Sequence, residues 1–134
     1  MLISAKVCNC ASAHRTQVST GAVTRSLDVA PKSSGRGSSV NGGEFLMLAL
    51  ATCYCNDLFR EAARLGVRID AVEVEASADF PDVGLAATNI RYRAKVQSAA
   101  PEAELARLLR ETDAVAEVHN TIRAGVAVEL LPDA

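Results

Sequence analysis

The feature that most constrains this chain is a predicted helix from Glu44 to Gly66 whose first two turns contain no polar stripe. Every residue from Phe45 to Ala51 is apolar, so this half of the helix has no face suited to water and is expected to be buried. From Asn56 onward charged residues alternate with apolar ones, which predicts an amphipathic second half that reaches the surface. Gly66 is expected to end the helix as a C-cap.

Composition limits the classes of protein that this chain can belong to. A chain of 134 residues, 49% apolar and with a net charge of −2, fits a single globular domain over 1–134. Basic residues are scattered singly and aromatic residues are few, so we expect no nucleic-acid partner. No apolar run is long enough to span a membrane, and Met1 to Val7 lacks the apolar region of a signal peptide. These patterns favour a cytoplasmic protein without a membrane partner.

The cysteines favour thiol chemistry over a disulfide framework or a metal site. In a cytoplasmic protein the four cysteines are expected to be reduced. Cys8-Asn9-Cys10 and Cys53-Tyr54-Cys55 lack the two-residue separation of zinc knuckles, and only His14 and His119 could add imidazole ligands. We therefore expect no metal and no other cofactor.

The first part of the chain predicts strands, and a hairpin follows the central helix. Alternating patterns and turn residues predict an antiparallel meander of three strands: Ile3 to Cys10, His14 to Thr20 and Val23 to Val29. The Gly/Ser-rich segment from Pro31 to Gly43 is expected to form a loop that rims a pocket. Strands within 67–80 and 88–96 then predict a half-buried hairpin whose Glu and Arg/Lys rows form cross-strand charge pairs.

The last part of the chain predicts two helices and a final strand. Pro101 is expected at position N1 of a helix, and Asp113 is expected to restart a shorter helix that runs to Arg123. Gly125 would cap this helix before a strand from Val126 to Leu131. The predicted fold class is α+β, with the order βββ-α-ββ-α-α-β. Because so short a chain supplies few elements to cover a helix that is apolar all round, we expect an obligate homodimer around it.

Two segments carry a resemblance to a known family. The sequence from Asn41 to Tyr54, NGGEFLMLALATCY, resembles the pattern N-P-x-E-L-L-x-A-A-x-A-A-C-F of the osmotically inducible protein C and organic hydroperoxide resistance (OsmC/Ohr) proteins. The tail from His119 to Val128 is similar to the second signature of that family, and the predicted order of elements agrees. The resemblance implies an intertwined α+β homodimer that reduces organic hydroperoxides with a thiol, at sites between the subunits.

The resemblance also implies roles for particular residues. Cys53 matches the cysteine that attacks the peroxide, whereas Ala116 stands where the family has the cysteine that resolves the sulfenic acid. The glutamate that helps to activate the reactive thiol falls at Gly43, with Glu44 one residue later and about 100° further around the helix. Candidate activating cations are Arg15 and Arg36, and the sequence does not choose between them.

The remaining polar residues have simpler alternative interpretations. Cys53 could also be a small buried hydrophobe. Cys55 points about 200° away from Cys53 on the helix and is expected to fill the core rather than resolve the oxidised thiol. Cys8 and Cys10 share one strand face and could supply another resolving thiol, or could be simple strand residues. His119 could line the pocket or serve only in packing.

Three functions remain open from the sequence. The first is reduction of organic hydroperoxides through Cys53, with an external thiol that closes the cycle. The second is non-catalytic binding of an apolar, acyl-like ligand in a pocket at the dimer interface. The third is a purely structural dimer. The retained Cys53 favours the first function, while the missing resolving cysteine favours the second.

Overall fold

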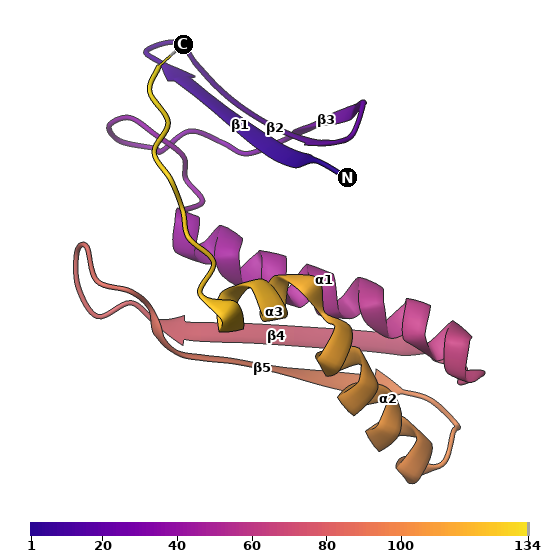
Figure 1. Cartoon of the computed structure of the whole chain (residues 1–134). Helices are drawn as coiled ribbons and strands as arrows, with labels where there is room; N and C mark the ends of the chain where they lie inside the picture. The colour runs from indigo at the N-terminus through magenta and orange to yellow at the C-terminus, as the bar shows by residue number, and fades with distance from the viewer. Residues whose placement is uncertain (134) are drawn as a thin grey trace. The chain divides into compact units, whose positions relative to one another are not determined.

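The computed structural model describes residues 1–133 and has the predicted α+β composition (Figure 1). In chain order its elements are β1 (Ile3–Cys10), β2 (Ala13–Thr20), β3 (Val23–Leu27), α1 (Gly42–Leu65), β4 (Ala71–Asp79), β5 (Thr88–Gln97), α2 (Glu102–Val115) and α3 (Glu117–Ala124). They form two compact units, Met1–Phe45 and Leu46–Ala134. The predicted order is confirmed from the first strand through the last helix.

The first unit is the predicted antiparallel meander. Strand β2 lies between β1 and β3, and all neighbouring strands run antiparallel. Thr20 pairs with Val23 across a two-residue turn, in which Gly21 has a φ of +56°. This left-handed conformation suits glycine, which has no Cβ to clash with the backbone. The turn residues noted in the sequence therefore fix the register between β2 and β3.

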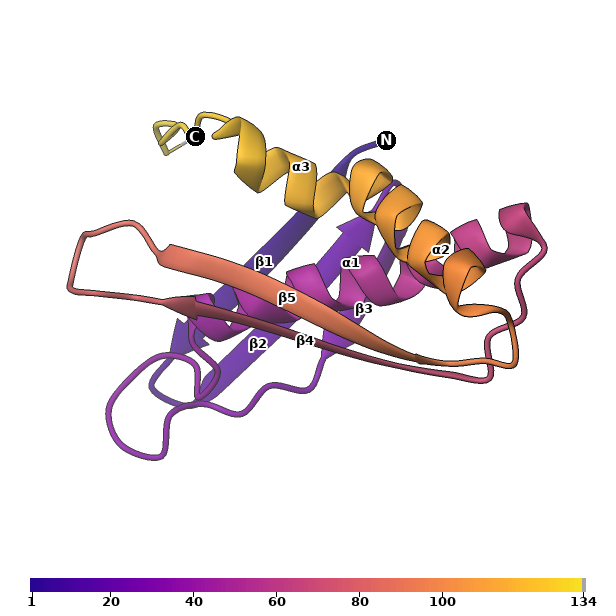
Figure 2. The same ribbon diagram turned by 90° about the horizontal axis from the view of Figure 1, so that it is seen from below.

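The second unit is built on the hairpin of β4 and β5. Its solvent-facing side carries the predicted charge pairs, with Arg93 2.7 Å from Glu75 and Lys95 3.6 Å from Glu73. The three helices lie on the other face of this hairpin (Figures 1 and 2). The core between them is centred on residues of α1 and α2 and on the break before α3: Tyr54, Leu58, Ala62, Leu108 and Ala116. The hairpin therefore has one face covered by helices and one face exposed to solvent, as its alternating sequence predicts.

Helix α1 begins at Gly42, two residues before the predicted start, and a capping box stabilises its first turn. The Asn41 side chain accepts a hydrogen bond from the Glu44 backbone N–H at 2.8 Å, and the Glu44 side chain accepts one from the Asn41 N–H at 3.1 Å. This reciprocal pair satisfies two amide groups at the helix start. At the other end Gly66 has a φ of +69°, in agreement with the predicted C-cap.

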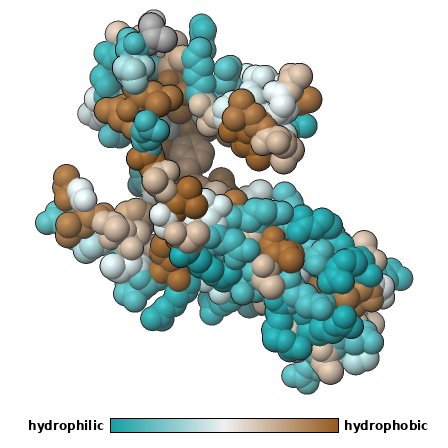
Figure 3. All heavy atoms as spheres, in the orientation of Figure 1, coloured by the Kyte–Doolittle hydropathy of each residue, from teal (hydrophilic) through white to brown (hydrophobic). Residues whose placement is uncertain are grey.

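The burial of α1 differs from the prediction. The first half, expected to be buried, is only partly covered, and Leu48 is 58% exposed. The second half, expected to surface, contains most of the buried residues of this helix, with Leu58 fully buried. Its amphipathic face packs on the hairpin and on α2, so the chain covers this half by itself. Apolar side chains of large size also reach the surface elsewhere (Figure 3).

The boundaries of α2 and α3 also correct the prediction. Pro101 is the N-cap of α2 rather than its N1 residue, with a ψ of 145° that lies outside the helix. Asp113 does not restart a helix, because α2 continues through it to Val115. The break falls at Ala116, whose ψ of 105° is extended. Gly125 caps α3 in the left-handed conformation, as predicted.

The predicted last strand is not formed in this chain. The structure assigns no strand to residues 126–131, and the two sheets of the described residues consist of β1 to β3 and of β4 and β5. A strand needs a neighbour for its backbone hydrogen bonds, and the alternating sequence alone does not supply one. No helix in the described part of the chain is both long and apolar enough to cross a bilayer.

Candidate functional site

The thiol of Cys53 lies between two carboxylates. Its Sγ is 3.6 Å from Oδ2 of Asp57, one turn later on α1, and 3.9 Å from Oε2 of Glu117, the first residue of α3. The thiol can donate its single proton to either carboxylate, because an ionised carboxylate can only accept. The residue is partly buried at a point where α1 meets the start of α3. Helix α3 thus adds a second carboxylate beside Cys53, the cysteine that the sequence indicated as a candidate.

The surroundings of Cys53 oppose its ionisation. Burial raises the pKa of the Cys53 thiol, and the negative charges of Asp57 and Glu117 raise this pKa further. A hydrogen bond from the backbone amide of Val118, in the first turn of α3, acts in the opposite direction but does not outweigh them. At neutral pH Cys53 is therefore a thiol that donates its proton toward a carboxylate, rather than a free thiolate.

Arg60 is the cation that joins this cluster. Its Nη1 lies 3.1 Å from Oδ1 of Asp57 and 3.7 Å from Oε1 of Glu117, while its Nε lies 3.5 Å from Glu61. Burial raises the pKa of Asp57, and Arg60 lowers it only in part, because Glu117 adds a further unfavourable charge. Asp57 is thus a buried carboxylate with an increased affinity for a proton.

Ala116 lies directly beside this cluster in the chain. Its side chain is fully buried at the break between α2 and α3, and the next residue, Glu117, contacts Cys53. The position that the family resemblance assigns to a resolving cysteine is therefore adjacent to a residue that contacts the Cys53 thiol, but it carries a methyl group. No sulfur atom is available there to form a disulfide with Cys53.

His119 is buried in an aromatic cluster rather than beside Cys53. Its ring centroid is 4.4 Å from that of Tyr92 and 5.8 Å from that of Tyr54, and neither ring nitrogen has a hydrogen-bond partner among the described residues. Burial lowers the pKa of His119, and the nearby Arg123 lowers it further. The side chain is therefore neutral at pH 7. Its packing role, which the sequence left as an alternative, is the one that these contacts support.

The same cluster contains two buried phenols. Tyr54 donates a hydrogen bond to the carbonyl of Leu109 at 2.8 Å, and burial raises its pKa to about 12. Tyr92 donates to the Asp113 carboxylate, which also accepts from Arg123 at 2.6 Å. Both tyrosines are therefore un-ionised at neutral pH. They hold α2 and α3 against α1 and β5.

The candidate activating residues from the sequence lie in the first unit, and each has a local partner there. Glu44 completes the capping box of α1. Arg36 donates to Oδ1 of Asn9 at 2.9 Å, and Nδ2 of Asn9 lies 3.0 Å from Nδ1 of His14. Arg15 faces Cys8 across the β1–β2 pairing. Within the second unit Arg60 is the cation that pairs with the carboxylates around Cys53.

The other cysteines differ from Cys53 in their surroundings. Cys55 is partly buried on another side of α1 and forms no disulfide. Cys10 is exposed near the β1–β2 turn, where the Ser12 hydroxyl 3.5 Å away, the amides of Ser12 and Ala13, and the charge of Arg15 together lower its pKa. A cavity of about 260 Å³ in the first unit is lined by this region: Cys8, Asn9, Cys10, Ser12, Ala13 and Arg15.

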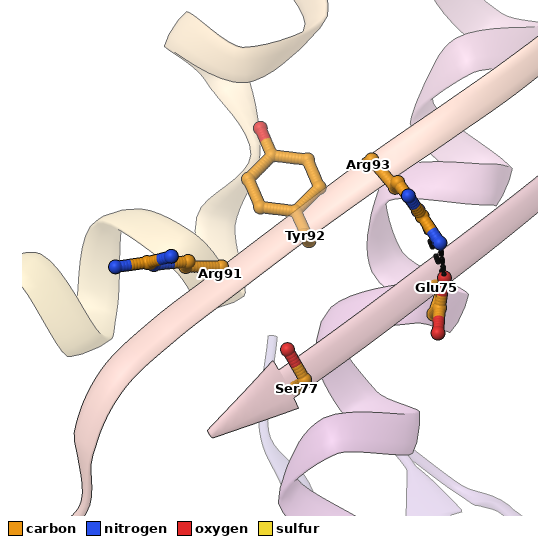
Figure 4. Close-up of a pocket in the computed structure, with 5 residues that line it drawn as sticks. All are labelled: Glu75, Ser77, Arg91, Tyr92 and Arg93. Atoms are coloured by element: carbon orange, nitrogen blue, oxygen red, sulfur yellow. Dashed lines mark hydrogen bonds and ion pairs between the residues drawn. The ribbon is translucent and has the colours of Figure 1, made fainter. Parts of the chain in front are cut away.

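A pocket on the β4–β5 hairpin contains no thiol. It has a volume of about 320 Å³ and is lined by Glu75, Ser77, Arg91, Tyr92 and Arg93. Figure 4 shows Arg93 bound to Glu75 and the Tyr92 ring directed away from that pair. The Ser77 hydroxyl has no histidine beside it in this lining, and the carboxylate of Glu75 is paired with Arg93, so the pocket offers no activated nucleophile.

Sequence reasoning found Cys53 but missed most of its neighbours. The sequence places Asp57 one helical turn after Cys53, where a carboxylate is expected to oppose a thiolate, and the raised pKa of Cys53 agrees. Glu117 was not identifiable, because its contact depends on how α3 packs against α1 after the break at Ala116. Arg60 carried a weak signal, since it lies three residues after Asp57 on the same helix face.

Comparison with known proteins identifies the family. The family model described as OsmC-like protein matches residues 35–131. A search of proteins with curated annotation found no significant sequence match to this chain. The fold is shared with several solved structures at low sequence identity.

Three of these structures illustrate the likeness. An OsmC-like protein from Mycoplasma pneumoniae is 18% identical with a TM-score of 0.64, covering 90% of this chain and 85% of that one. An organic hydroperoxide resistance protein from Elizabethkingia anophelis, with thiocyanate bound, is 14% identical with a TM-score of 0.62, covering 92% and 89%. An organic hydroperoxide resistance protein OsmC from Legionella pneumophila is 14% identical with a TM-score of 0.59, covering 92% and 90%. Because the family model spans most of its length, this chain belongs to the OsmC-like family.

Proposed function

We propose that this OsmC-like protein reduces organic hydroperoxides through Cys53 and is regenerated by an external thiol. The observation that carries the proposal is the contact of the Cys53 thiol with the carboxylates of Asp57 and Glu117. A thiol with a raised pKa is a poor nucleophile unless a base removes its proton during attack. Asp57 lies in position to act as that base, and its own raised pKa suits proton transfer.

The reaction balances with these groups. Cys53 sulfur attacks the terminal oxygen of the hydroperoxide while its proton passes to Asp57, and the O–O bond breaks. The departing alkoxide takes the proton from Asp57 and leaves as an alcohol, so that Cys53 becomes a sulfenic acid. One external thiol then displaces water to form a mixed disulfide, and a second releases Cys53 and the oxidised reductant.

The need for an external reductant follows from position 116. Ala116 provides no sulfur to capture the sulfenic acid, although it lies next to a residue that contacts Cys53. The organic hydroperoxide resistance proteins among the solved structures support the substrate class, while the fold alone does not assign it. The proposal therefore depends on the chemistry around Cys53.

The decisive variant is Asp57→Asn. It distinguishes two roles of Asp57: its role as a proton acceptor and the effect of its negative charge on the pKa of Cys53. Removing the negative charge lowers the pKa of Cys53, so alkylation by iodoacetamide, which needs only a thiolate, should become faster. Reduction of cumene hydroperoxide should become slower, by about tenfold or more, because the proton acceptor is lost. Stopped-flow peroxide consumption and alkylation rates at one pH measure the two effects on the same protein.

Cysteine variants provide the matched controls. Cys53→Ser should abolish peroxide consumption, whereas Cys55→Ser, on the same helix, should leave it unchanged. If Asp57→Asn accelerates both reactions, Cys53 acts as a simple thiolate and the base role is wrong. If Cys53→Ser consumes peroxide at the wild-type rate, the peroxidase function is wrong and ligand binding becomes the leading alternative.

Non-catalytic binding of an apolar ligand remains the second candidate function. The raised pKa of Cys53 favours it, because an unreactive thiol would suit the wall of a binding site. In that case an acyl-like fluorescent probe should bind wild type and Cys53→Ser equally well.

We further propose that the working form is a homodimer and that 1–134 acts as one OsmC-like domain. The family match spans the boundary between the two units, which supports a single domain. Two features support the dimer: the partly exposed apolar half of α1, including Leu48, and the unpaired segment 126–131. A second copy could cover the first and pair with the second. Light scattering at micromolar concentration should give a dimer, and a stable folded monomer would contradict this architecture.

A further inference from the structure

Three potential metal ligands converge at Cys53. The Sγ of Cys53, a carboxylate oxygen of Asp57 and one of Glu117 all lie within 4.8 Å of one another. The first two residues are separated by one turn of α1, and the third begins α3. The sequence showed no metal-binding spacing, because one ligand comes from a helix that is distant in the chain.

The two distances from the Cys53 sulfur are close to those of a tetrahedral zinc site. When zinc is bound at about 2.3 Å from sulfur and about 2.0–2.2 Å from oxygen in tetrahedral geometry, a sulfur ligand and an oxygen ligand lie about 3.6 Å apart. The distances from Cys53 Sγ are 3.6 Å to Asp57 and 3.9 Å to Glu117. The Glu117 side chain is 71% exposed and can close the remaining 0.3 Å by a small rotation.

Arg60 orients the carboxylates without occupying the oxygens that face the thiol. It contacts Oδ1 of Asp57 and Oε1 of Glu117, whereas Cys53 faces Oδ2 and Oε2 of the same groups. Each carboxylate thus has one oxygen held from outside and one directed inward. This division is typical of metal sites, in which outer residues fix the orientation of the ligands.

The charge of the cluster is compatible with a bound cation. The carboxylates of Asp57, Glu117 and Glu61 all contact Arg60, and the buried Glu61 also pairs with Arg64 at 3.0 Å. Arg60 contacts Asp57 and Glu117 from outside, so a cation on the inward side would further reduce the repulsion between these two carboxylates. The inward side of the cluster offers the three donors that such an ion would bind.

We propose that Cys53, Asp57 and Glu117 bind a Zn²⁺ ion, with water as the fourth ligand. The mixed set of one thiolate and two carboxylates suits zinc better than the harder Mg²⁺ or Ca²⁺. Binding releases the Cys53 proton to solvent and forms a Zn–S bond. The metal site stands on this geometry alone. One consequence rests on the proposed function: zinc would occupy the sulfur electron pair that attacks the hydroperoxide and would therefore block reduction reversibly.

The test is a titration of the full, metal-free, reduced protein with Co²⁺, which reports its ligands by absorption. Wild type should develop a sulfur-to-cobalt charge-transfer band in the near ultraviolet, together with the intense visible bands of tetrahedral cobalt. Added Zn²⁺ should remove both. Cys53→Ser should lose the charge-transfer band, whereas Cys55→Ser should keep it.

Carboxylate variants test the other ligands. Glu117→Gln should weaken cobalt binding by about tenfold or more, by analogy with losses at other metal sites. Because Glu117 is mostly exposed, this variant should fold. The control Glu111→Gln, on α2 and paired with Arg64 and Arg107, should bind cobalt as wild type does.

The outcomes separate the site from the enzyme. A charge-transfer band that persists in Cys53→Ser, or binding unaffected by Glu117→Gln, would overturn the metal site. Absence of any tetrahedral cobalt signal in wild type would do the same. Cobalt binding by a protein that consumes no hydroperoxide would retain the site and reject the proposed function. Peroxide consumption by Cys53 that saturating zinc does not inhibit would show that zinc does not bind this sulfur, and would overturn the metal site.

Discussion

The turn that holds Cys10 and the helix junction that holds Cys53 give the same side chain opposite properties. Cys10 is exposed beside a hydroxyl, two amides and an arginine, and its pKa is lowered. Cys53 is partly buried beside two carboxylates, and its pKa is raised. The thiol that ionises more easily is therefore not the one at the position that resembles the family's reactive cysteine.

Under the proposed function, this difference distinguishes a thiol that merely ionises easily from one that has a proton acceptor beside it. Reagents that need only a thiolate should prefer Cys10, because they respond to ionisation and access. A hydroperoxide also needs a proton for its leaving alkoxide, and Cys53 has a carboxylate in position to accept and return one. The following predictions test whether this distinction holds.

The largest expected effect comes from Ala116→Cys, which gives Cys53 a possible thiol partner and leaves Cys10 unchanged. In wild type the Cys53 sulfenic acid should persist or over-oxidise. In the variant the introduced thiol should convert most of it to a disulfide with loss of water. Intact mass spectrometry after one equivalent of cumene hydroperoxide distinguishes the products.

Position 115 provides the control for this experiment. Val115→Cys adds a thiol one residue earlier, where the side chain is 41% exposed and precedes the break between α2 and α3. It should not form the disulfide efficiently. A rapid disulfide from Cys53 in wild type would show that Cys8 or Cys10 already resolves it, and the need for an external reductant would be wrong.

The second prediction is a difference in alkylation rates. At pH 8 iodoacetamide should modify Cys10 about tenfold or more faster than Cys53, because Cys10 has the larger thiolate fraction and the better access. Ser12→Ala should slow Cys10 alone by removing a hydrogen bond to its sulfur. Peptide mass spectrometry over time measures both sites. Equal rates in wild type would remove the contrast between the two regions.

The smallest expected effect concerns the stability of the second unit. Burial lowers the pKa of His119, and Arg123 lowers it further, against the opposing charges of Asp113 and Asp57. In the unfolded chain this imidazole therefore binds a proton near its usual pKa of about 6.5, whereas in the folded chain it binds one only at lower pH. The free energy of unfolding should therefore fall as the pH decreases from 7 to 5. Above pH 7 the side chain is neutral in both states, so His119 should cause no loss of stability there.

The variant His119→Phe tests this assignment. It removes two buried nitrogens without partners among the described residues and keeps a ring against Tyr54 and Tyr92. The free energy of unfolding should rise by about 1 kcal/mol at pH 7, and its decline toward pH 5 should become shallower. Urea unfolding at several pH values provides the measurement. A destabilised variant would indicate that His119 has a polar partner in the assembled protein.

The sequence predicted the elements well because their signals are local. The turn at Gly21, the alternation of β4 and β5, and the caps at Gly66 and Gly125 depend on residues close in the chain. The predictions failed where tertiary packing, rather than local sequence, determines the structure. The periodicity of α2 could not locate the break at Ala116, and the alternating segment 126–131 could not show whether it has a neighbour.

The candidate site was predictable only in part. The family resemblance indicated Cys53 and the absence of a resolving cysteine at Ala116. The contact with Glu117 depends on the packing of α3 against α1, which no local pattern specifies. Glu44 was a candidate for activation, whereas its observed role is to cap α1, a role that Asn41 and Glu44 already encode as a capping pair.

The most direct test is to locate the first oxidised thiol. Reduced, metal-free protein would receive one equivalent of cumene hydroperoxide in the presence of a sulfenic-acid trap, followed by peptide mass spectrometry. We predict that the trap labels Cys53 before Cys10, although Cys10 has the lower pKa. Label that accumulates first on Cys10, with Cys53 unmodified, would contradict the claim that the carboxylates around Cys53 form the reactive site.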